Sequence, residues 1–575
     1  MIDTTNRDKY LKKKLPQERT VTPVEMLSSE DRSANMRRLM RYQQMWEALK
    51  DFRTRRKRNK EYFNGNQWGD LIKTENGYIT EEKSILEQGK IPLKNNMISS
   101  TVTSILGVFR NSYGKPEVIA RSVDNQKLGE MNTCIAEYIY QHARVKEIDA
   151  KDMLEYMISG MCGQISDFQY DNVSMRNEEQ LLSINPSRVI LNGGIEDPRG
   201  GDITTIGVLL DMSIDEAVTK FARDKKDADK IRAIYKTANK DFVTNLYRTF
   251  DRSVVADVDF LCASSQHLCR VIQVWEHEYE DVYLVHDHLS GTWEQYPLSD
   301  GEAIDEMIQQ REIDIEINGW DYELSKIEKK FHHDEFWYVR YLSPCGDVLY
   351  EGRSPFAHKS HPFTICLGHL IDGEIHSFVE NIIDQQRYIN RLITLIDFIM
   401  GASAKGVLVF PENAIPKDMS KEDILEQWTS YRGVIFANLK PGTQMPQQIS
   451  TNATNIGASE MLALQMQLIR DISGVHGALQ GKEAKSGTAA SLYAQEASNA
   501  QVNIADLLEK FTEFRQARDY KLVKIAPQCY DAPFFIALAG NEYSKEAHYW
   551  NPELAASADV YVNLSENNNT AVYRM

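Results

Sequence analysis

The residues best suited to chemistry lie within 276–288, where histidines and carboxylates gather. These are Glu276, His277, Glu278, Asp281, His286, Asp287 and His288. On a strand alternate residues share a face, so His286 and His288 could both bind one ion such as Zn²⁺. The sequence specifies no third ligand, however, and charged hairpins are common. We therefore expect no metal and no cofactor, here or at His332-His333-Asp334, and keep a metal-dependent nuclease as a less favoured alternative.

The usual signatures of catalysis are missing from the chain. It has no GxxxxGK[ST], GxSxG, HExxH or GxGxxG pattern, so nothing points to a P-loop ATPase, a serine hydrolase or a dinucleotide enzyme. The glycines around Val475 fit a hinge better than a phosphate cradle. The seven scattered cysteines show neither a nucleophile context nor a disulfide framework, and we expect reduced thiols. We predict that the protein is not an enzyme.

Composition indicates a globular protein of several lobes. The 575 residues are 42% hydrophobic and 26% charged, and the net charge is −17. A protein that grips nucleic acid over its whole surface is usually basic, so any DNA contact should be local or weak. We expect no signal peptide, because residues 1–16 are polar, and no membrane span, because charged residues interrupt the best candidate, 388–410.

The strongest charge signal is a basic helix. Periodic apolar residues predict one helix over 33–63, after an N-terminal arm at 1–34. Residues 32–60 hold 11 Lys and Arg against Glu47 and Asp51. A charged helix face most often pairs with acidic neighbours, so we favour ion pairs over contact with nucleic acid. The candidate residues are Arg53, Arg55, Arg56 and Arg58.

The middle of the chain mixes helices and strands, so we predict an α+β, mainly α-helical protein. Apolar periodicity predicts helices at 95–109, 126–144, 148–163 and 214–237. Strand patterns cover 116–122, 164–211, 268–300, 335–352 and 362–369, with an acidic helical insertion at 301–328.

The C-terminal third has a different order of elements. A helix at 378–405 carries an apolar stripe too wide to be covered on one side only. Its stripe consists of Ile382, Gln386, Ile389, Ile393, Ile396 and Met400. A compact segment at 406–451 follows, with strands at 407–410 and 433–437 and a short helix at 421–430. Then come a helix at 458–472, a glycine-containing loop at 473–487 and a long helix at 488–526. From periodicity alone, a core helix of an ordinary domain is the better interpretation of 378–405, and only the order of the elements that follow reverses this preference.

That layout resembles the portal proteins of tailed bacteriophages, of the short-tailed-phage type, and the composition resembles crAss-like phage portals. Asp384-Gln385-Gln386-Arg387-Tyr388-Ile389-Asn390 is similar to the family's "DxQRxxN" entry into its first stem helix. Ser473-Gly474-Val475, Gly481 and Ser486-Gly487-Thr488-Ala489 are similar to "sGv…G…SGxA". Residues 62–68, ending in Gln67-Trp68, and Asn95-Asn96 resemble the early wing segments.

The resemblance implies a portal fold. Its parts would be an arm at 1–34, a wing at 35–380, stem helices at 381–404 and 456–476, a clip at 405–455, a tunnel loop at 477–490, and a long wing and crown helix with the C-terminal segment at 491–575. It implies a ring of twelve subunits at the capsid vertex of the virion, assembled in the host cytoplasm. The ring would pass double-stranded DNA weakly and without sequence specificity during packaging and ejection. Its partners would be the terminase large subunit, then the tail adaptor, and the major capsid protein.

Particular residues acquire expected roles from this resemblance. Lys482 and Lys485, with Ser486 and Gly487, would face DNA from the tunnel loop, although a solvated surface loop explains the lysines almost as well. Trp428, Tyr431 and Arg432 are of types enriched in binding hot spots and would contact terminase or adaptor, unless they fill the core of the clip. The apolar stripe of 378–405 would pack between subunits. The basic helix would lie on the outer wing, where its arginines would pair with other subunits or capsid protein. The main alternative is another structural virion protein of the head or tail.

Overall fold

The computed structural model describes residues 21–540 and 560–565, apart from 75–76, 121–125, 172–173, 237–257, 266, 406, 410, 412–414, 416–418, 425–446, 450–456 and 476–489. The chain divides into two compact units. Unit 1 contains residues 1–57, 106–377 and 505–575, and unit 2 contains 58–105 and 378–504. Helices predominate over several small sheets, so the predicted α+β, mainly α-helical class is confirmed. Within the described ranges, no helix has the length and apolar composition needed to cross a membrane.

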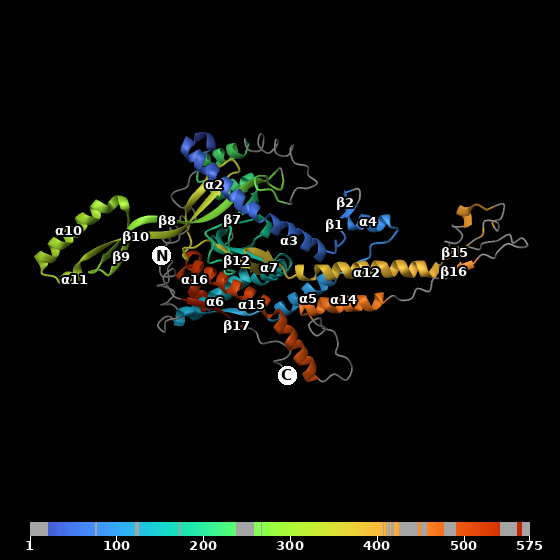
Figure 1. Cartoon of the computed structure of the whole chain (residues 1–575). Coiled ribbons are helices and arrows are strands. Elements are labelled where there is room, and N and C mark those ends of the chain that lie inside the picture. Colours follow the sequence, from blue (N-terminus) through green and yellow to red (C-terminus); the bar gives the residue numbers. More distant parts are fainter. Residues whose placement is uncertain are drawn as a thin grey trace, which may run out of the picture. The chain divides into compact units, whose positions relative to one another are not determined.

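The largest sheet of unit 1 is antiparallel, with strand order β11-β10-β8-β7-β6 and β9 paired to β8. The strands are β6 (Val189–Leu191), β7 (Thr205–Met212), β8 (Cys269–Asp287), β9 (Thr292–Pro297), β10 (Ile327–Leu342) and β11 (Val348–Arg353). The first half of β8 is buried without interruption, whereas its second half is largely accessible to solvent. This second half extends with β9, β10, α10 (Gly301–Asn318) and α11 (Tyr322–Ser325) as a projection of unit 1, here called the outer lobe, residues 279–335 (Figure 1).

A second group of elements completes unit 1. Strands β12 (Phe363–Leu367), β4 (Met161–Asp171) and β5 (Arg176–Ser183) form one small sheet, and β3 (Lys115–Ala120) pairs with β17 (Val560–Ser565). The short pair β13 (His369–Ile371) and β14 (Glu374–His376) follows β12. The helices of this group are α6 (Gln126–His142), α7 (Val145–Ser159), α8 (Ile214–Phe221), α15 (Ala490–Cys529) and α16 (Ala532–Ala539). Residues 225–236 are also helical.

The basic helix differs from the sequence prediction. Two helices, α2 (Ser29–Ala48) and α3 (Lys50–Phe63), replace the single helix expected at 33–63, and Leu49 interrupts them. The first begins four residues earlier than expected because Ser28 caps it, its Oγ accepting a hydrogen bond from the Asp31 amide at 3.1 Å. Residues 29–34 therefore belong to a helix and not to the predicted arm.

Buried charges tie α15 into unit 1. Arg518 is fully buried and pairs with Asp149 of α7 at 2.5 Å and with its neighbour Asp519 at 2.8 Å. Arg515 lies 3.1 Å from the other oxygen of Asp149. Burial alone would raise the pKa of Asp149, but the two arginines hold that pKa below its ordinary value. The carboxylate is therefore ionised at neutral pH and compensates the arginines inside the core.

Replacing Asp149 by asparagine removes the negative charge that pairs with the two buried guanidinium groups of Arg515 and Arg518. We expect Asp149→Asn to lower the free energy of unfolding by about 3–5 kcal/mol, the usual cost of removing one partner of a buried ion pair. Urea unfolding followed by circular dichroism measures this change. The matched control is Asp506→Asn, which removes the solvent-exposed pair between Asp506 and Lys510 on the same helix and should cost no more than about 0.5 kcal/mol. Equal losses in the two variants would contradict this account of α15.

Candidate functional site

Two helices of unit 2 run side by side (Figure 1). They are α12 (Glu380–Lys405) and α14 (Ala458–Ser473), close to the helices predicted at 378–405 and 458–472. Between them in sequence, β15 (Val407–Val409) pairs antiparallel with β16 (Gln447–Ile449), so the chain turns back and the helices are antiparallel. The strand at 407–409 matches the expectation, whereas β16 was not predicted, and the strand expected at 433–437 lies outside the described residues.

A cluster of buried amide side chains holds α12 to the rest of unit 2. The Gln386 side chain accepts a hydrogen bond from the Met97 amide at 2.9 Å and donates one to the Asn95 carbonyl at 2.6 Å. Asn390 accepts from the Asn95 amide at 3.1 Å and donates to Gln67 at 2.7 Å. Because Gln386 and Asn390 are fully buried, these bonds replace the water that both amides lose.

The same cluster reaches the end of α3 and the start of α5 (Met97–Asn111). Gln67 donates to the carbonyl of Tyr62 at 2.9 Å and to Asn96 at 3.0 Å. Asn96 in turn accepts from the Ser99 amide at 3.1 Å, which caps α5. We call Gln67, Asn96, Gln386 and Asn390 the amide cluster. It joins three segments that the sequence presents as separate motifs, and so gives a physical reason for their residue types.

Ion pairs surround the amide cluster. Glu81, itself almost fully buried, pairs with Arg387 at 3.1 Å and with Arg391 at 2.5 Å. Arg387 also lies 3.3 Å from Asp70, which pairs with Arg58 at 2.8 Å. Partial burial would raise the pKa of Asp70, but hydrogen bonds from Arg58 and Tyr62 and the nearby positive charges lower it overall. Ion pairs and hydrogen bonds thus hold one side of α12 inside unit 2.

Only some of the residues predicted for the stem interface are accessible to another subunit. Ile382, Gln386 and Ile389 are fully buried within the chain, so the expectation that they pack between subunits needs correction. The wide stripe arose because α12 is covered by elements of its own unit. Ile393 and Ile396 are half-buried, and Met400 is exposed. For these three residues the interface stays a prediction.

Other large apolar side chains of the helical pair are exposed. We call them the outer apolar residues: Tyr388, Leu395, Phe398 and Met400 of α12, with Met461, Leu464 and Ile472 of α14. Their exposed fractions range from 40% for Leu395 and Met461 to 66% for Met400. Single exposed apolar residues are ordinary, whereas seven on two adjacent helices make these helices a candidate contact surface for another protein.

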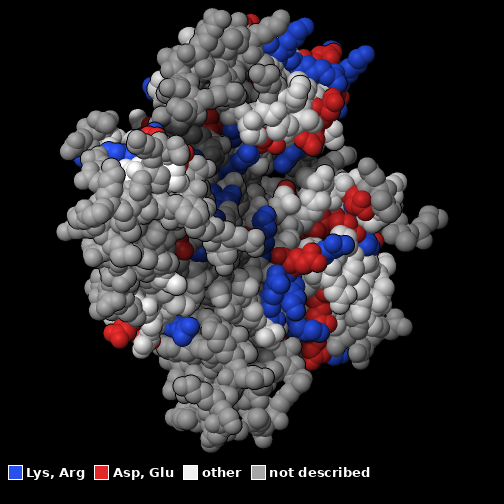
Figure 2. Space-filling view, turned by 90° about the vertical axis from the view of Figure 1, so that its right-hand side faces the viewer, with Lys and Arg blue, Asp and Glu red and all other residues white. Residues whose placement is uncertain are grey.

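The four arginines expected on the basic helix are all engaged within the chain. Arg53 stacks on the Trp46 ring at 3.5 Å, and burial lowers its pKa to about 10. Arg55 lies 3.5 Å from Glu374, Arg56 pairs with Glu155 at 2.7 Å, and Arg58 pairs with Asp70. On the face shown in Figure 2, basic side chains likewise lie beside acidic ones. Contacts of these arginines with other subunits, capsid protein or DNA stay predictions.

Two groups of predicted site residues lie outside the described residues. They are the clip residues Trp428, Tyr431 and Arg432, and the loop residues Lys482, Lys485, Ser486 and Gly487. Their roles rest on the sequence.

The acidic and histidine residues of 276–288 do not form one metal site. Glu276 is buried and accepts hydrogen bonds from Tyr42 at 2.6 Å and Arg340 at 2.8 Å, while Asp281 pairs with His333. Glu276 and His286 are ten residues apart on the extended strand β8, which separates them by about 33 Å. The geometry therefore contradicts a nuclease centre built on the whole segment.

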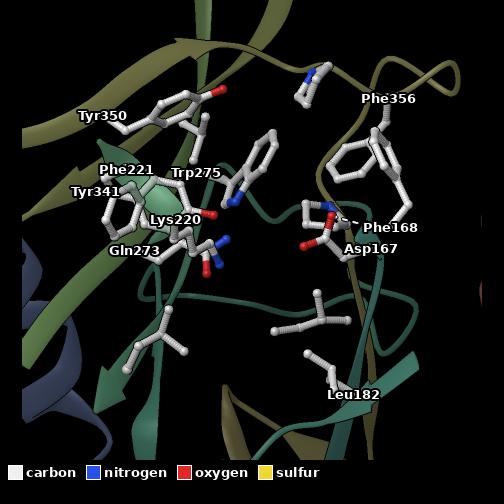
Figure 3. Close-up of a pocket in the computed structure, with 15 residues that line it drawn as sticks. Asp167, Phe168, Leu182, Lys220, Phe221, Gln273, Trp275, Tyr341, Tyr350 and Phe356 are labelled. Carbon is white, nitrogen blue, oxygen red and sulfur yellow. Dashed lines mark hydrogen bonds between the residues drawn. The ribbon is translucent and has the colours of Figure 1, made fainter. Parts of the chain in front are cut away.

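Unit 1 contains a small pocket of about 110 Å³ (Figure 3). Aromatic side chains, including Trp275, Tyr341 and Phe356, surround it, with Asp167 and Gln273 at its sides. The Asp167 carboxylate accepts a hydrogen bond from the Phe168 amide at 2.8 Å. Ligand sites usually measure roughly 300–1,000 Å³, so this space is small for a substrate pocket.

Comparison with known protein families gives one match. The family model described as phage P22-like portal protein matches residues 39–563. No curated protein matches the chain. The matched range includes most of unit 1, both helices of the pair and every residue of the amide cluster.

The amide cluster predicts the effect of removing one of its members. Asn390→Leu takes the donor from the buried Gln67 side chain and the acceptor from the Asn95 amide, and an unsatisfied buried group costs about 1–3 kcal/mol. We expect hydrogen exchange in peptides covering 93–97 to become faster by about tenfold or more, since a loss of 1.4 kcal/mol corresponds to a factor of ten.

The control for this variant is Asp397→Asn, which changes a solvent-exposed side chain of the same helix. Its exchange rates at 93–97 should match those of the parent protein. Unchanged exchange in Asn390→Leu would mean that the cluster does not hold α12.

Proposed function

Because the chain belongs to the phage P22-like portal protein family, we propose that copies of it close into the ring of a portal vertex through the outer apolar residues of α12 and α14. The portal role itself follows from the family match over residues 39–563, and the family is a structural one at the capsid vertex of the virion. We further propose that the chain carries no catalysis of its own. Exposure of seven large apolar side chains on one helical pair is the observation that carries the ring interface.

A ring places specific demands on the surface of a subunit. Head-to-tail contacts around a closed ring bury two different patches of every copy. We propose that Leu395 and Phe398 of α12 form one of these patches and that Leu464 and Ile472 of α14 form the other, since all four side chains are exposed. The buried amide cluster supports the interface indirectly, since it fixes α12 within its own unit. A helix so fixed presents its exposed side without further loss of conformational entropy.

The finer functions are also proposals. The ring, of twelve subunits, passes double-stranded DNA into and out of the capsid. Residues 405–455, with Trp428, Tyr431 and Arg432, contact first the terminase large subunit and then the tail adaptor. The wing at 35–380 contacts the major capsid protein. Assembly takes place in the host cytoplasm before the ring becomes part of the virion.

Weak contact with DNA suits the charge of the chain. At a net charge of −17 per copy, a ring repels the phosphates of a duplex over most of its surface. The loop at 477–490 supplies the exceptions: Lys482 and Lys485, with Ser486 and Gly487 beside them, face the DNA and the two lysines touch phosphate. Phosphate contacts are independent of base sequence, so the whole genome passes equally well.

The first test of this proposal is the ring itself. We expect the purified chain to form closed rings in light scattering after size exclusion and in electron micrographs. Leu464→Asp should reduce the ring fraction at least about tenfold, because each interface loses about 2 kcal/mol of apolar burial and must bury a carboxylate.

The matched control changes the same position without changing its polarity. Leu464→Met keeps volume and apolar character and should leave the rings intact. Intact rings in Leu464→Asp would overturn the proposed interface, and a purified parent chain that stays monomeric would overturn the ring.

The second test concerns the loop lysines. Each lost phosphate contact makes the dependence of log K on log salt shallower by about 0.9. In fluorescence anisotropy with rings and a short duplex, Lys482→Ala with Lys485→Ala should flatten that slope by at least about 0.9.

Lys225→Ala with Lys226→Ala serves as the control, since it removes two adjacent exposed lysines from unit 1. This pair should leave the slope as it is. The loop proposal fails if both double variants behave like the parent ring.

A further inference from the structure

Three potential metal ligands meet in the outer lobe, although only two of them are close in sequence. His286 lies on β8 and is paired directly with Glu328 of β10. His288 is the first residue after β8, and its ring lies beside that of His286. One ligand atom from each of His286, His288 and Glu328 lies within 4.8 Å of the others. The sequence did not reveal Glu328 as a third ligand, because this residue is forty positions away from His288.

The distance between His288 and Glu328 fits a shared ion better than a hydrogen bond. The Nε2 atom of His288 lies 3.7 Å from the Glu328 carboxylate, and it is buried without a hydrogen-bond partner. Two ligands of one tetrahedral zinc ion, each bonded at about 2.0–2.1 Å, are separated by roughly 3.3 Å. The pair therefore needs a movement of only a few tenths of an ångström to bind one ion.

The packing of His286 leaves its nitrogens available. Its ring stacks on Trp293 of β9 with 4.0 Å between the ring centroids and 13° between the planes. Stacking uses the face of the imidazole, whereas metal binding uses a nitrogen lone pair in the ring plane. Trp293 thus orients the ligand without competing for it, and His288 lies 4.1 Å from His286 by ring centroids.

Main-chain and side-chain bonds hold the strands at this point. The His288 amide donates to the Lys326 carbonyl at 3.1 Å, two residues before Glu328. Asp287, on the opposite side of the strand, pairs with Arg311 of α10 at 2.9 Å. Because both strand ends are fixed, the three ligands need little ordering when an ion binds.

One competing charge is close. Lys330 lies 3.3 Å from the other oxygen of Glu328, and the oxygen that faces His288 is free of that contact. The lysine neutralises part of the carboxylate charge and so tempers the affinity for a cation. It leaves the histidine side of the site unobstructed.

From this geometry we propose that His286, His288 and Glu328 bind a divalent transition-metal ion of the zinc class. Two imidazoles and one carboxylate match the donor preferences of Zn²⁺, and the side chains, only partly buried, leave a fourth position for water. The ion would pin β8 to β10 in the outer lobe. This site is independent of ring closure, since all three ligands belong to one copy of unit 1.

The test uses the full-length chain, freed of metal by dialysis against a chelator. Titration with ZnCl₂ in a calorimeter should show about one tight site per chain, and CoCl₂ should give the visible absorption of tetrahedral Co²⁺. His288→Ala and the nearly isosteric Glu328→Gln should each weaken Zn²⁺ binding at least about tenfold. Even mutation of a residue that only hydrogen-bonds a metal ligand lowers metal affinity by about tenfold or more.

The control is His332→Ala, which removes an exposed histidine from the same strand as Glu328. It should bind Zn²⁺ like the parent chain, and circular dichroism should show all three variants folded. The proposal is overturned if the parent chain binds no Zn²⁺, or if His288→Ala and Glu328→Gln bind it as tightly as His332→Ala.

Discussion

The amide side chains of Gln386 and Asn390 impose the constraint on which unit 2 depends. Both are fully buried. A buried amide without hydrogen-bond partners lowers the stability of the fold by more than most single contacts raise it. They are satisfied only when α12, the segment 93–97 and Gln67 hold one arrangement. A buried polar group of this kind adds less to stability than to uniqueness, because shifting the helix by a residue breaks several hydrogen bonds together.

That constraint gives α12 two different sides. The side with Ile382, Gln386 and Asn390 is closed within the chain, and the side with Leu395 and Phe398 is open. In unit 1 the buried pair of Asp149 and Arg518 fixes α15 in a comparable way. Each unit therefore has a charged or polar interior anchor, and in unit 2 that anchor leaves apolar side chains for contacts between copies.

The sequence predicts well whatever depends on local periodicity. The helices α12 and α14 and the strand β15 appear close to their expected bounds, because apolar spacing and glycine signals are local. The break at Leu49 was missed, since the apolar stripe continues across it. Tertiary bonding was also missed: Gln386 looked like an interface residue because its partners, Asn95 and Met97, are 291 and 289 positions away. One signal for α15 was present, as Arg515 and Arg518 share the helix face of Phe511 and Phe514.

The central claim is that α12 is held by its own chain on one side and covered by a neighbouring copy on the other. An electron cryomicroscopy reconstruction of the assembled protein, at a resolution that shows side chains, tests it most directly. The account predicts Leu395, Phe398 and Leu464 beneath a neighbouring subunit, with Gln386 and Asn390 bonded to segment 93–97 of their own chain. A reconstruction in which those three apolar side chains face solvent, or in which the two amides reach into another subunit, would contradict it.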